Sequence, residues 1–539
     1  MTSPATKTLQ TLLADVLPKD HHFDIFHLST PPTRCPPLYA PPPNERPERT
    51  YCEKHFLAAC VDEKPRGKEN SDGTEGQAPR RVLVLGIEVF IFTTSRTTTI
   101  FVSKADSTGY LHLLKLPRGA PSPIREICAA FVGFLVEKRR REGVKLIVNL
   151  FARAQAQYLF PGSVDNKDKH VLDDRGLVKW WCRVLDPILV QEKDARGYIV
   201  VPGLDEHDTR AYVPRGTGSS GHWVQGHPLN RISRYAREYD WVPPRCLIPR
   251  FPDDPKSRFR DELDEEAMQS GLFRTTGSWK TVKTLDMFWE MMAYRQECSS
   301  GRMTGFIWLV FDDEEKEDAP PAHPESQTAV LLRTPKANRT INVTPTTTPR
   351  KLFPKASESK SLEEAPDAAS RVKPKDKKKK KQRKCRWPSG PVKARAPRVK
   401  TALRNYLLDQ AESTAYYTWT PAGRGERVFS ETDYKRIHEL LLHLDFSTLD
   451  KAAGSTRRWL GEVGMGATWG YAVIGTREGA VTETKEAVSG DAAAPKVNNL
   501  TGLVKRKRNV SSSEGTNGAV NVLGAGLVRK KPKSEEKQE

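Results

Sequence analysis

The clearest hydrophobic pattern in the chain lies between residues 81 and 151. Continuous apolar runs rich in β-branched residues predict buried strands at residues 82–92, 97–104 and 144–151. Between the second and third runs, residues 122–140 change to a helical period with one apolar face. This face consists of Ile124, Ile127, Cys128, Phe131 and Leu135. Strands combined with helices in this way predict a mixed α/β domain around a central β-sheet.

The flanking segments extend this pattern. Residues 1–61 begin with a short amphipathic helix around Leu13 and continue as Pro-rich extended chain, and residues 62–79 have the composition of a surface loop. Asp173 or Asp174 is expected to cap a short helix that carries two adjacent tryptophans. The further predicted elements are a strand at 198–201, a helix at 279–297 and a strand at 306–311.

Residues 100–127 are predicted to run as a strand, an acidic turn at Asp106, a second strand, a basic loop and a helix start. Ser122 suits the N-cap of that helix, and Lys115 and Arg118 lie in the loop before it. A helix N-terminus behind a basic loop can hold a phosphate or pyrophosphate group. Any helix that follows a basic loop has the same pattern, and the glycine spacing matches neither a Walker loop nor a dinucleotide fingerprint.

The composition changes at residue 312. Residues 312–398 are acidic at first and then rich in Pro, Thr, Ser and Lys, which predicts a disordered insertion. Within it, residues 371–386 hold eleven Lys/Arg and one Asp. A nuclear localisation signal is the favoured interpretation, ahead of a DNA-contacting arm and of a merely solvated run of charge. Residues 399–475 regain helical periodicity, with Ser430 as a cap, and are expected to pack back on the first domain.

The last part of the chain, residues 476–539, is predicted to be a disordered basic tail. It contains a short repeat, GLVKRK at 502–507 and GLVRKK at 526–531. A small apolar anchor beside a basic triplet suits docking to an acidic protein surface. A second localisation signal explains the repeat equally well.

Charge and cysteine content narrow the class of protein. A net charge of +20 and an isoelectric point near 9.5 favour nucleic acid, chromatin or acidic partners. The eight cysteines form no CxxC pair, which predicts reduced thiols in a cytosolic or nuclear protein, without disulfides or a metal site. No apolar run reaches membrane-spanning length, and residues 1–13 lack the apolar core of a signal peptide.

Four segments carry residues suited to a reaction site. Their polar and aromatic members are Asp106, Arg153, Gln155, Tyr158, Trp180, Trp181, Asp253, Asp254 and Lys256. Prolines on both sides restrict the backbone of Asp253 and Asp254, and Lys256 invites an ion pair. Taken singly, a core tryptophan, a turn with a helix cap and an ordinary salt bridge are simpler explanations.

Together these segments resemble the fungal histone H3 lysine acetyltransferases that act with histone chaperones. The resemblance covers most of residues 1–311, together with 399–475. It rests on the segments FHLSTPPTRCPPLYAPPP, RPERTYCEKHF, FVSKADSTGYLHLLKLPRG, LFARAQAQYLFPGS, KHVLDDRGLVKWWCRVLD, PPRCLIPRFPDDPKSRF and FWEMMAYRQECSSGRMTGFIWLVF. That family shares its fold with the CREB-binding-protein type of acetyltransferase. The resemblance implies a central mixed β-sheet surrounded by helices, with residues 1–311 as the catalytic domain.

The resemblance also implies a site. Acetyl-CoA is expected against Ala105, Asp106 and Ser107, with its pyrophosphate on Leu114, Lys115, Leu116, Pro117 and Arg118. Its channel is expected to be lined by Phe151, Arg153, Gln155, Tyr158, His170, Val171, Leu172 and Trp180. The implied catalytic group comprises Asp254, Asp253, Asp106 and Trp181, with Trp181 beside the substrate-lysine tunnel. Lys256 matches a lysine that such enzymes acetylate on themselves, and no metal is implied.

The chemistry of the reaction is consistent with these residues. A lysine amine, with an ordinary pKa of about 10.4, must be neutral to attack a thioester. An apolar aromatic tunnel disfavours the ammonium form, and a carboxylate can accept its proton directly or through water. We rank binding and orientation of the amine above a dedicated general base.

The resemblance implies histone H3–H4 as substrate, at a core lysine near the DNA entry site and at tail lysines. It also implies chaperones of the nucleosome-assembly-protein and anti-silencing types, a nuclear location, and a role in replication-coupled nucleosome assembly and genome stability. The acidic patches at 261–266 and 312–318 suit a basic substrate or an ordinary solvated face. The alternatives are a non-enzymatic chromatin-binding scaffold, which allows direct DNA contact through the basic segments, and an acetyltransferase for small amines.

Overall fold

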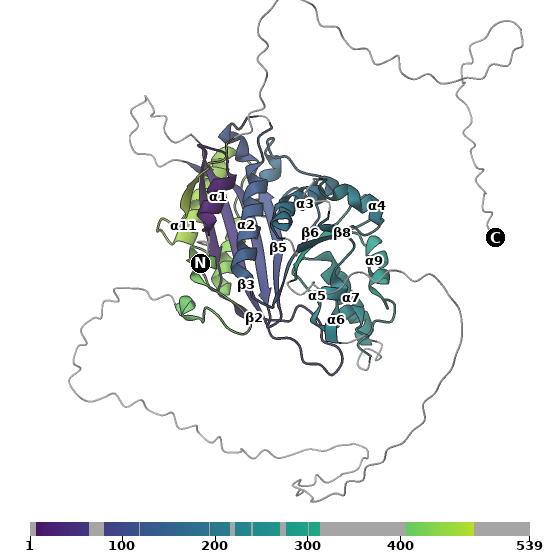
Figure 1. Cartoon of the computed structure of the whole chain (residues 1–539). Coiled ribbons are helices and arrows are strands. Elements are labelled where there is room, and N and C mark those ends of the chain that lie inside the picture. Colours follow the sequence, from purple (N-terminus) through teal and green to yellow (C-terminus); the bar gives the residue numbers. More distant parts are fainter. Residues whose placement is uncertain are drawn as a thin grey trace, which may run out of the picture. The chain divides into compact units, whose positions relative to one another are not determined.

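The computed structural model describes residues 7–63, 80–117, 119–192, 195–215, 221–238, 241–269, 276–299, 301–312 and 406–478. The chain divides into two units, Met1–Ala480 and Val481–Glu539, and all of the described residues belong to the first (Figure 1). Of the predicted loop at 62–79, the predicted insertion at 312–398 and the predicted tail at 476–539, residues 64–79, 313–398 and 479–539 lie outside the described residues.

One mixed β-sheet of eleven strands organises the described part of the chain. Its order is β10-β1-β3-β4-β5-β6-β9-β7-β8, with β11 beside β1 and β2 beside β3. The strands are β1 (His22–Ser29), β2 (Thr33–Cys35), β3 (Thr50–Asp62), β4 (Arg81–Thr93), β5 (Thr97–Ser107), β6 (Lys145–Ala152), β7 (Ala195–Val200), β8 (Trp223–Gln225), β9 (Gly305–Phe311), β10 (Arg427–Val428) and β11 (Tyr471–Ile474). The predicted α/β class with a central mixed sheet is confirmed.

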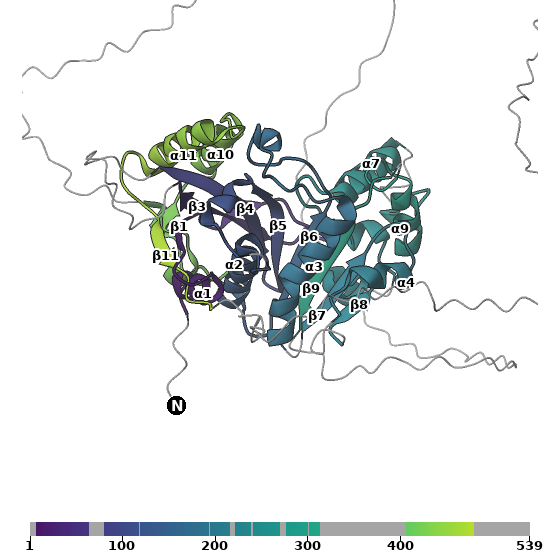
Figure 2. The ribbon, with the colours of Figure 1, turned by 90° about the horizontal axis from the view of Figure 1, so that it is seen from above.

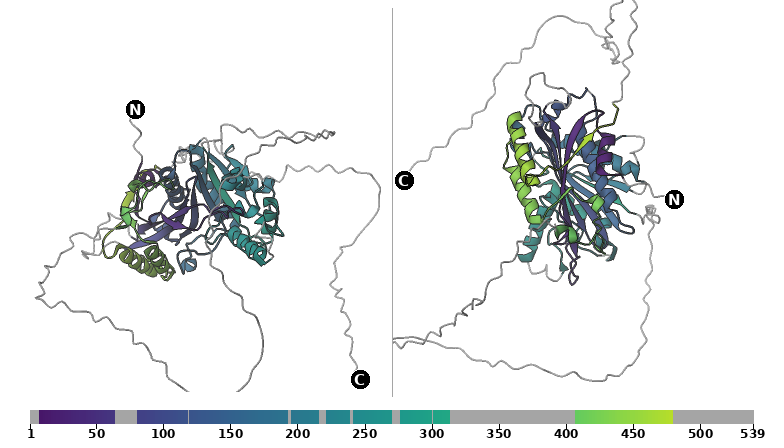
Figure 3. Two further views of the ribbon diagram at one scale, coloured as in Figure 1. Left: turned by 90° about the horizontal axis from the view of Figure 1, so that it is seen from below. Right: turned by 90° about the vertical axis from the view of Figure 1, so that its left-hand side faces the viewer.

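Helices cover both faces of this sheet. Helices α1 and α2 lie on one face of the β1–β5 half, and α10 and α11 lie on the other (Figures 2 and 3). The α-helices are α1 (Leu9–Val16), α2 (Pro123–Arg139), α3 (Asp174–Gln191), α4 (Glu206–Thr209), α5 (Leu229–Ile232), α6 (Arg234–Glu238), α7 (Pro255–Gln269), α9 (Leu285–Ala293), α10 (Glu431–Leu442) and α11 (Leu449–Gly464). Short 3₁₀ helices are η1 (Tyr110–Leu114), η2 (Ser163–Asp165), η3 (Arg210–Tyr212), η4 (Pro244–Cys246), η5 (Tyr406–Asp409) and η6 (Pro421–Gly423).

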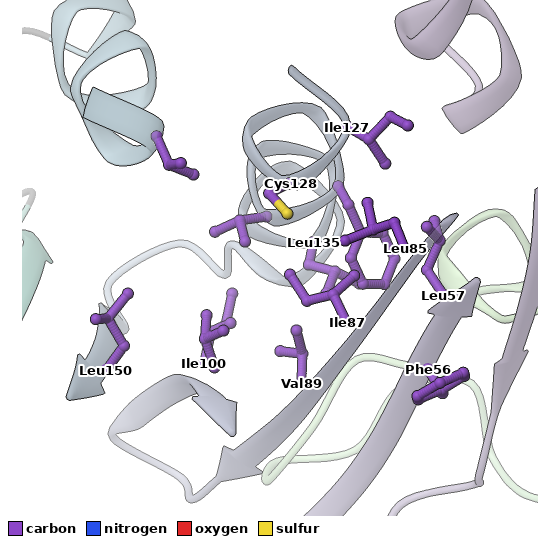
Figure 4. Packing of buried hydrophobic residues seen from close by; sticks show 14 of the residues in the cluster. Phe56, Leu57, Leu85, Ile87, Val89, Ile100, Ile127, Cys128, Leu135 and Leu150 are labelled. Carbon is purple, nitrogen blue, oxygen red and sulfur yellow. The ribbon is translucent and has the colours of Figure 1, made fainter. Parts of the chain in front are cut away.

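The predicted apolar face of α2 packs on the centre of the sheet. Ile127, Cys128 and Leu135 are at most 1% exposed and lie over strands β4 and β5, as Figure 4 shows. Each fully buried side chain of this size contributes about 1.5–3 kcal/mol relative to exposure. Helix α2 connects the parallel strands β5 and β6. Its packing on the sheet therefore positions the C-terminal end of β5, where the site begins.

The structure corrects several predicted elements. The second strand expected after Asp106 is wrong: β5 continues through Ser107, and the chain then turns at Gly109 into η1. Gly109 has φ +90°, and an added Cβ would lie 2.7 Å from the Lys169 backbone, so only glycine fits this turn. The helix expected at 279–297 is limited to α9.

Strands β1 and β3 were expected only as extended chain because buried polar residues interrupt their apolar pattern. His27, Glu53 and His55 are at most 3% exposed and bond to one another across the two strands. Arg139 of α2 completes this cluster through Glu53. A polar network inside a sheet removes the hydrophobic signal from which strands are predicted.

The segment from 406 to 478 packs against the first part of the chain. Strand β11 pairs antiparallel with β1, and β10 pairs parallel with β1. Helix α11 contributes the Thr456 hydroxyl, which accepts a hydrogen bond from the Leu83 backbone N–H at 3.0 Å. Trp459 lies 5.7 Å from the ring of Phe56, so the two parts share one hydrophobic core.

Candidate active site

A pocket of about 520 Å³ lies where β5, η1, α2 and α3 meet. Most of the residues predicted to hold acetyl-CoA line it, although they come from four distant parts of the sequence. These residues are Ala105, Asp106, Ser107, Gln155, Tyr158, His170, Val171, Leu172 and Trp180; Trp181, predicted beside the substrate tunnel, also lines the pocket. The structure therefore brings together residues that lie in separate segments of the sequence.

Asp106 ties the wall of this pocket together. Its Oδ2 accepts hydrogen bonds from the Tyr158 N–H at 2.7 Å and the Leu159 N–H at 2.9 Å. Its Oδ1 accepts from the Ser107 N–H at 2.8 Å and from the Lys169 ammonium at 2.9 Å. The side chains of Asp106 and Lys169 are only 6% and 5% exposed. These hydrogen bonds connect Asp106 to the loop after β6 and to Lys169.

The expected anion seat lies at the N-terminus of α2, where Ser122 and Ile124 line the pocket. Among the described contacts, the Ser122 side chain makes no capping hydrogen bond, so the first backbone N–H groups of α2 are available to an anion. Residues 114–117 connect η1 to this end, but Leu114, Lys115, Leu116 and Pro117 do not line the pocket. Arg118 lies outside the described residues.

A narrow passage of about 40 Å³ continues from the pocket. The two hollows share Ala105, Tyr158, Leu177 and Trp181. The remaining walls of the passage are Val102, Ser103, Lys104, Leu150, Phe151 and Arg153. The Tyr158 hydroxyl donates a hydrogen bond to the Arg153 carbonyl. Burial raises the pKa of Tyr158 to about 12, so this hydroxyl stays neutral. The passage is thus aromatic on one side and polar on the other.

A β-bulge shapes the polar side of the passage. Glu88 of β4 pairs with Lys104, whereas the next residue, Val89, pairs with Val102, so Ser103 is the extra residue of β5. Bulges redirect side chains locally and are frequent beside active sites. Here the bulge places Ser103 and Lys104 together in the passage wall.

Glu88 holds both of these residues. Its buried carboxylate accepts hydrogen bonds from Ser103 Oγ at 3.0 Å and from the Tyr434 hydroxyl of α10 at 3.1 Å. Lys104 Nζ lies 3.7 Å from Glu88 and 3.2 Å from the Asp253 carboxylate. The Asp253 side chain is 69% exposed, and its φ of +57° turns the backbone between Phe251 and α7. Lys104 therefore connects the passage wall to an exposed carboxylate.

Asp254 and Lys256 form a completely buried ion pair at the start of α7, each with 0% side-chain exposure. Asp254 also accepts hydrogen bonds from the Lys256 N–H at 3.1 Å and from Ser257 Oγ at 3.2 Å, so it acts as a cap of α7. Burial raises the pKa of Asp254 and lowers the pKa of Lys256, and the attraction between the two opposes both shifts.

Aromatic rings connect this pair to the passage. Lys256 Nζ lies 5.1 Å from the Phe251 ring and 5.3 Å from the Phe306 ring. Phe251 stacks on Phe101 at 4.4 Å, and Phe306 pairs across the sheet with Phe151, which lines the passage together with Trp181. A series of aromatic rings thus leads from the passage wall, which includes Trp181, to the Asp254–Lys256 pair.

Sequence reasoning gave no role in the site to Lys169, Glu88, Tyr434 or Asp174, although it named Asp174 as a possible helix cap. The Asp174 carboxylate accepts hydrogen bonds from the Ala154 N–H at 2.7 Å and the Met303 N–H at 3.0 Å, which anchors the loop after β6. No local spacing links these residues to the site, since their partners are between 15 and 346 positions away in the chain. Only the buried charge of Glu88, within an otherwise apolar run, could have drawn attention.

Comparison with known proteins identifies the family. A model of the histone acetyltransferase KAT11-type domain matches residues 9–147 and 141–462, which is most of the chain. The chain belongs to the KAT11-type histone acetyltransferases. It is therefore an acetyltransferase, and not the non-enzymatic scaffold considered as an alternative.

Two KAT11-type relatives are described as histone acetyltransferase rtt109. The protein from Aspergillus flavus is 36% identical, and the alignment covers 98% of this chain and 99% of the relative. The protein from Schizosaccharomyces pombe is 32% identical over 43% of this chain and 57% of the relative. A crystal structure of Rtt109 from Aspergillus fumigatus matches 88% of this chain and 100% of its own with a TM-score of 0.61 and 36% identity. This match confirms the expected acetyltransferase fold.

Membership of the KAT11-type family implies acetyl-CoA as the acetyl donor, and the residues present fit it. The pocket combines apolar walls with an open helix N-terminus, which suits a pantetheine chain that ends in phosphates. In the described part of the chain, three clustered metal-ligand side chains occur at Asp205, His207 and Asp208, all exposed. None of these three lines the pocket or the passage, and the metal-free mechanism stays a prediction. Among the described residues, no helix combines the length and apolar character needed to cross a membrane.

Proposed function

We propose that this acetyltransferase transfers the acetyl group to lysines of histone H3, at the core lysine near the DNA entry site and at tail lysines. The observation that carries the proposal is the narrow passage, which opens from the pocket beside Trp181 and ends near the Lys104–Asp253 pair. We expect this small passage, bordered by Phe151, Tyr158 and Trp181, to admit an unbranched lysine side chain. Its aromatic wall favours the neutral amine over the ammonium form.

The predicted cofactor residues fall into three proposed groups. The pocket residues from Ala105 to Ser107, together with Gln155, Tyr158, the 170–172 segment and Trp180, would bind the acyl-pantetheine part. The 114–118 segment and the N-terminus of α2 would meet the pyrophosphate. Phe151 and Arg153 belong to the passage and would guide the reacting end. When bound, acetyl-CoA supplies a thioester carbonyl that accepts the amine, with CoA leaving as its thiol.

The three candidate carboxylates would have different roles. Asp106 is occupied by backbone N–H groups and Lys169, so it acts by positioning the loop after β6. Asp254 is buried and bonded to Lys256, so it acts through that pair. Asp253 is exposed and lies beside Lys104, so it is the carboxylate that can pass the amine proton to solvent. Orientation of the amine by Trp181 and its neighbours supplies the larger share of the rate.

Lys256 is the proposed site of self-acetylation. Burial lowers the pKa of its amine, which increases the neutral, nucleophilic fraction. In the transfer, a bond forms between Nζ and the acetyl carbon, the C–S bond breaks, and the amine proton leaves with the thiol. Acetylation removes the charge that Asp254 pairs with and alters the field next to the passage.

The biological setting is proposed from the resemblance. We infer a nuclear enzyme that acts on histone H3–H4 with chaperones of the nucleosome-assembly-protein and anti-silencing types, in replication-coupled nucleosome assembly and genome stability. The net charge of +20 and the basic segments support a nuclear location and allow direct DNA contact.

Two measurements test the proposal. Acetyl-CoA should raise the melting temperature in a saturable way. Labelled acetyl should enter histone H3–H4 in the presence of a chaperone much faster than it enters a free polyamine. Equal labelling of the polyamine would favour the small-amine alternative, and absence of both effects would refute the proposed site.

A further inference from the structure

A second groove, of about 570 Å³, lies beside α9, strand β7 and the edge strand β8. Its walls are the chain after β7 (residues 199–206), the turn at 225–227 and one side of α9. It shares no lining residue with the acetyl-CoA pocket or with the narrow passage. The site described above therefore makes no use of it.

The groove is strongly acidic. Asp205, Glu206, Asp286 and Glu290 line it and are exposed, and no lysine or arginine is among its lining residues. Within the described ranges, none of these four carboxylates forms an ion pair. Four unneutralised carboxylates around one hollow create a negative potential that favours a cationic ligand.

Two unpaired buried nitrogen atoms at the groove give independent evidence for a ligand. Trp289 is 8% exposed and lines the groove, and its buried indole Nε1–H has no hydrogen-bond partner in the described part of the chain. The His227 ring lies 5.7 Å from that of Trp289, and its buried Nδ1 also has no hydrogen-bond partner among the described residues. Buried polar groups are normally paired. A peptide backbone offers carbonyl and N–H groups that could pair with the Trp289 and His227 nitrogens. A metal ion alone does not offer both kinds of partner.

The rim adds a surface for a basic side chain. Tyr294, at the end of α9, is 86% exposed and lines the groove. An exposed aromatic ring next to carboxylates attracts lysine and arginine through its face as well as through charge. The combination of carboxylates, an exposed ring and the unpaired side-chain nitrogens of Trp289 and His227 fits an extended peptide rich in lysine and arginine.

The groove is adjacent to the proposed reaction site. The Trp289 ring lies 5.2 Å from Phe306, which in turn lies 5.3 Å from Lys256 Nζ. Strands β6 and β7 both pair antiparallel with β9, so both end at the same edge of the sheet. The loop that lines the pocket follows β6, and the groove wall follows β7, two strand spacings or about 10 Å apart.

We propose that this groove binds a Lys/Arg-rich segment of the histone substrate, outside the lysine that is acetylated. The proposal rests on the proposed function only in taking a histone as the substrate. Anchoring a second basic segment here would hold the histone at the enzyme and raise the local concentration of its target lysine at the passage.

The test measures peptide binding without acetyl transfer. A fluorescent histone H3 tail peptide is titrated with the full chain at low salt, in the absence of acetyl-CoA. The double variant Asp286→Asn with Glu290→Gln removes two groove charges. The matched control, Glu142→Gln with Glu462→Gln, removes two exposed charges elsewhere. A peptide whose lysines and arginines are replaced by glutamine reports the contribution of charge.

The groove variant should bind the tail peptide roughly 3- to 10-fold more weakly, and the control variant should bind within about 2-fold of the unmodified chain. Tyr294→Ala should also weaken binding, while the melting temperature shift caused by acetyl-CoA stays the same in all variants. Equal affinity of the groove and control variants would overturn the proposal. Because no acetyl transfer is involved, that result is distinguishable from failure of the proposed function, which would appear as missing histone acetylation by the unmodified chain.

Discussion

Asp106 and Asp254 are both carboxylates at the proposed site, but their surroundings differ. Asp106 accepts hydrogen bonds from backbone N–H groups and from the Lys169 ammonium, whereas Asp254 accepts from the ammonium and N–H of Lys256 and from the Ser257 hydroxyl in a fully buried setting, where burial raises its pKa. The sequence could indicate that both residues matter. It could not separate a loop anchor from half of a buried ion pair, because the donors Tyr158 and Lys169 lie more than 50 positions from Asp106.

Asp106→Asn is expected to weaken acetyl-CoA binding roughly 10-fold, because an amide cannot accept from the loop and from Lys169 at once. Lys169→Met should have a similar effect if Asp106 acts by positioning. Asp165→Asn, an exposed aspartate on η2, serves as the control. Calorimetric titration with acetyl-CoA measures the change, and an unaltered dissociation constant in Asp106→Asn would contradict the anchoring role.

Lys256→Arg should lower the turnover number roughly 10-fold, because arginine cannot be acetylated to relieve the buried charge and is too large for the aromatic cage. Lys256→Gln, which resembles acetyl-lysine in shape and charge, should retain more activity. Lys435→Arg on the exposed face of α10 is the control. Steady-state rates with histone H3–H4 decide the matter: equal rates for Lys256→Arg and the unmodified enzyme would rule out activation by self-acetylation.

At the scale of elements, the passage depends on contacts between strands β4 and β5 and helix α10. The bulge at Ser103 sets Lys104 in the wall, and Tyr434 of α10 fixes Glu88 behind it. Helix α10 follows the acidic-then-basic insertion in the sequence, yet it completes a site whose other residues precede that insertion. A chain that ended before α10 would leave the Glu88 carboxylate without this partner.

Tyr434→Phe removes a hydrogen bond from a buried carboxylate and should lower the free energy of unfolding by about 1–3 kcal/mol. It should also reduce histone acetylation, since Ser103 and Lys104 lose their fixed partner. Tyr417→Phe is the control, because the Tyr417 ring is buried and its hydroxyl forms no hydrogen bond among the described residues. Chemical denaturation of both variants gives the comparison, and equal losses would contradict the role of α10.

The elements most reliably predicted from the sequence are those with a continuous apolar pattern. Strands β4, β5, β6 and β9 and helix α2 match their predicted positions within a few residues. Helix α7 was missed, since its sequence is mostly charged and its only signal was the capping aspartate. The predicted second strand failed at Gly109, whose left-handed turn is visible only once its contact with Lys169 is known.

For the molecule as a whole, a buried polar chain links the two parts of the described unit. His27 Nε2 and His55 Nδ1 are 2.9 Å apart, and His55 Nε2 and Glu53 Oε1 are 2.6 Å apart. Arg139 pairs with Glu53 and donates to the Gly423 carbonyl at 2.7 Å. Burial lowers the pKa of both histidines. Burial alone would raise the pKa of Glu53, but Arg139 and His55 outweigh it and hold that pKa at about 2.

These shifts predict how stability depends on pH. The unfolded chain binds protons at the two histidines below about pH 6.5, and at Glu53 below about pH 4.5, whereas the folded chain does not. Stability should therefore fall from about pH 7 to 5 and again from about pH 4.5 toward 2. His27→Gln should flatten the first step, and His207→Gln, at an exposed histidine, should not. Melting curves at several pH values test this, and an identical slope in both variants would contradict it.

Long-range contacts limit what the sequence reveals about the site. The resemblance implied a single site for Trp181, Asp254 and the pocket residues, and this stays a prediction; the passage itself is formed by residues of β5, β6 and α3 only after folding. Roles such as that of Lys169 depend on a partner 63 positions away and have no local pattern. Burial and hydrogen-bond partners, which decide these roles, are properties of the fold.

The most direct test of the account is a crystal structure of the enzyme bound to a conjugate of CoA and a lysine side chain. We predict that the CoA part occupies the pocket between β5 and α3. The lysine methylenes should pass between Trp181 and Ser103, with the backbone of the conjugate emerging near Lys104 and Asp253. A conjugate whose lysine side chain lies elsewhere, with Trp181 and the narrow passage unoccupied, would contradict the proposed site.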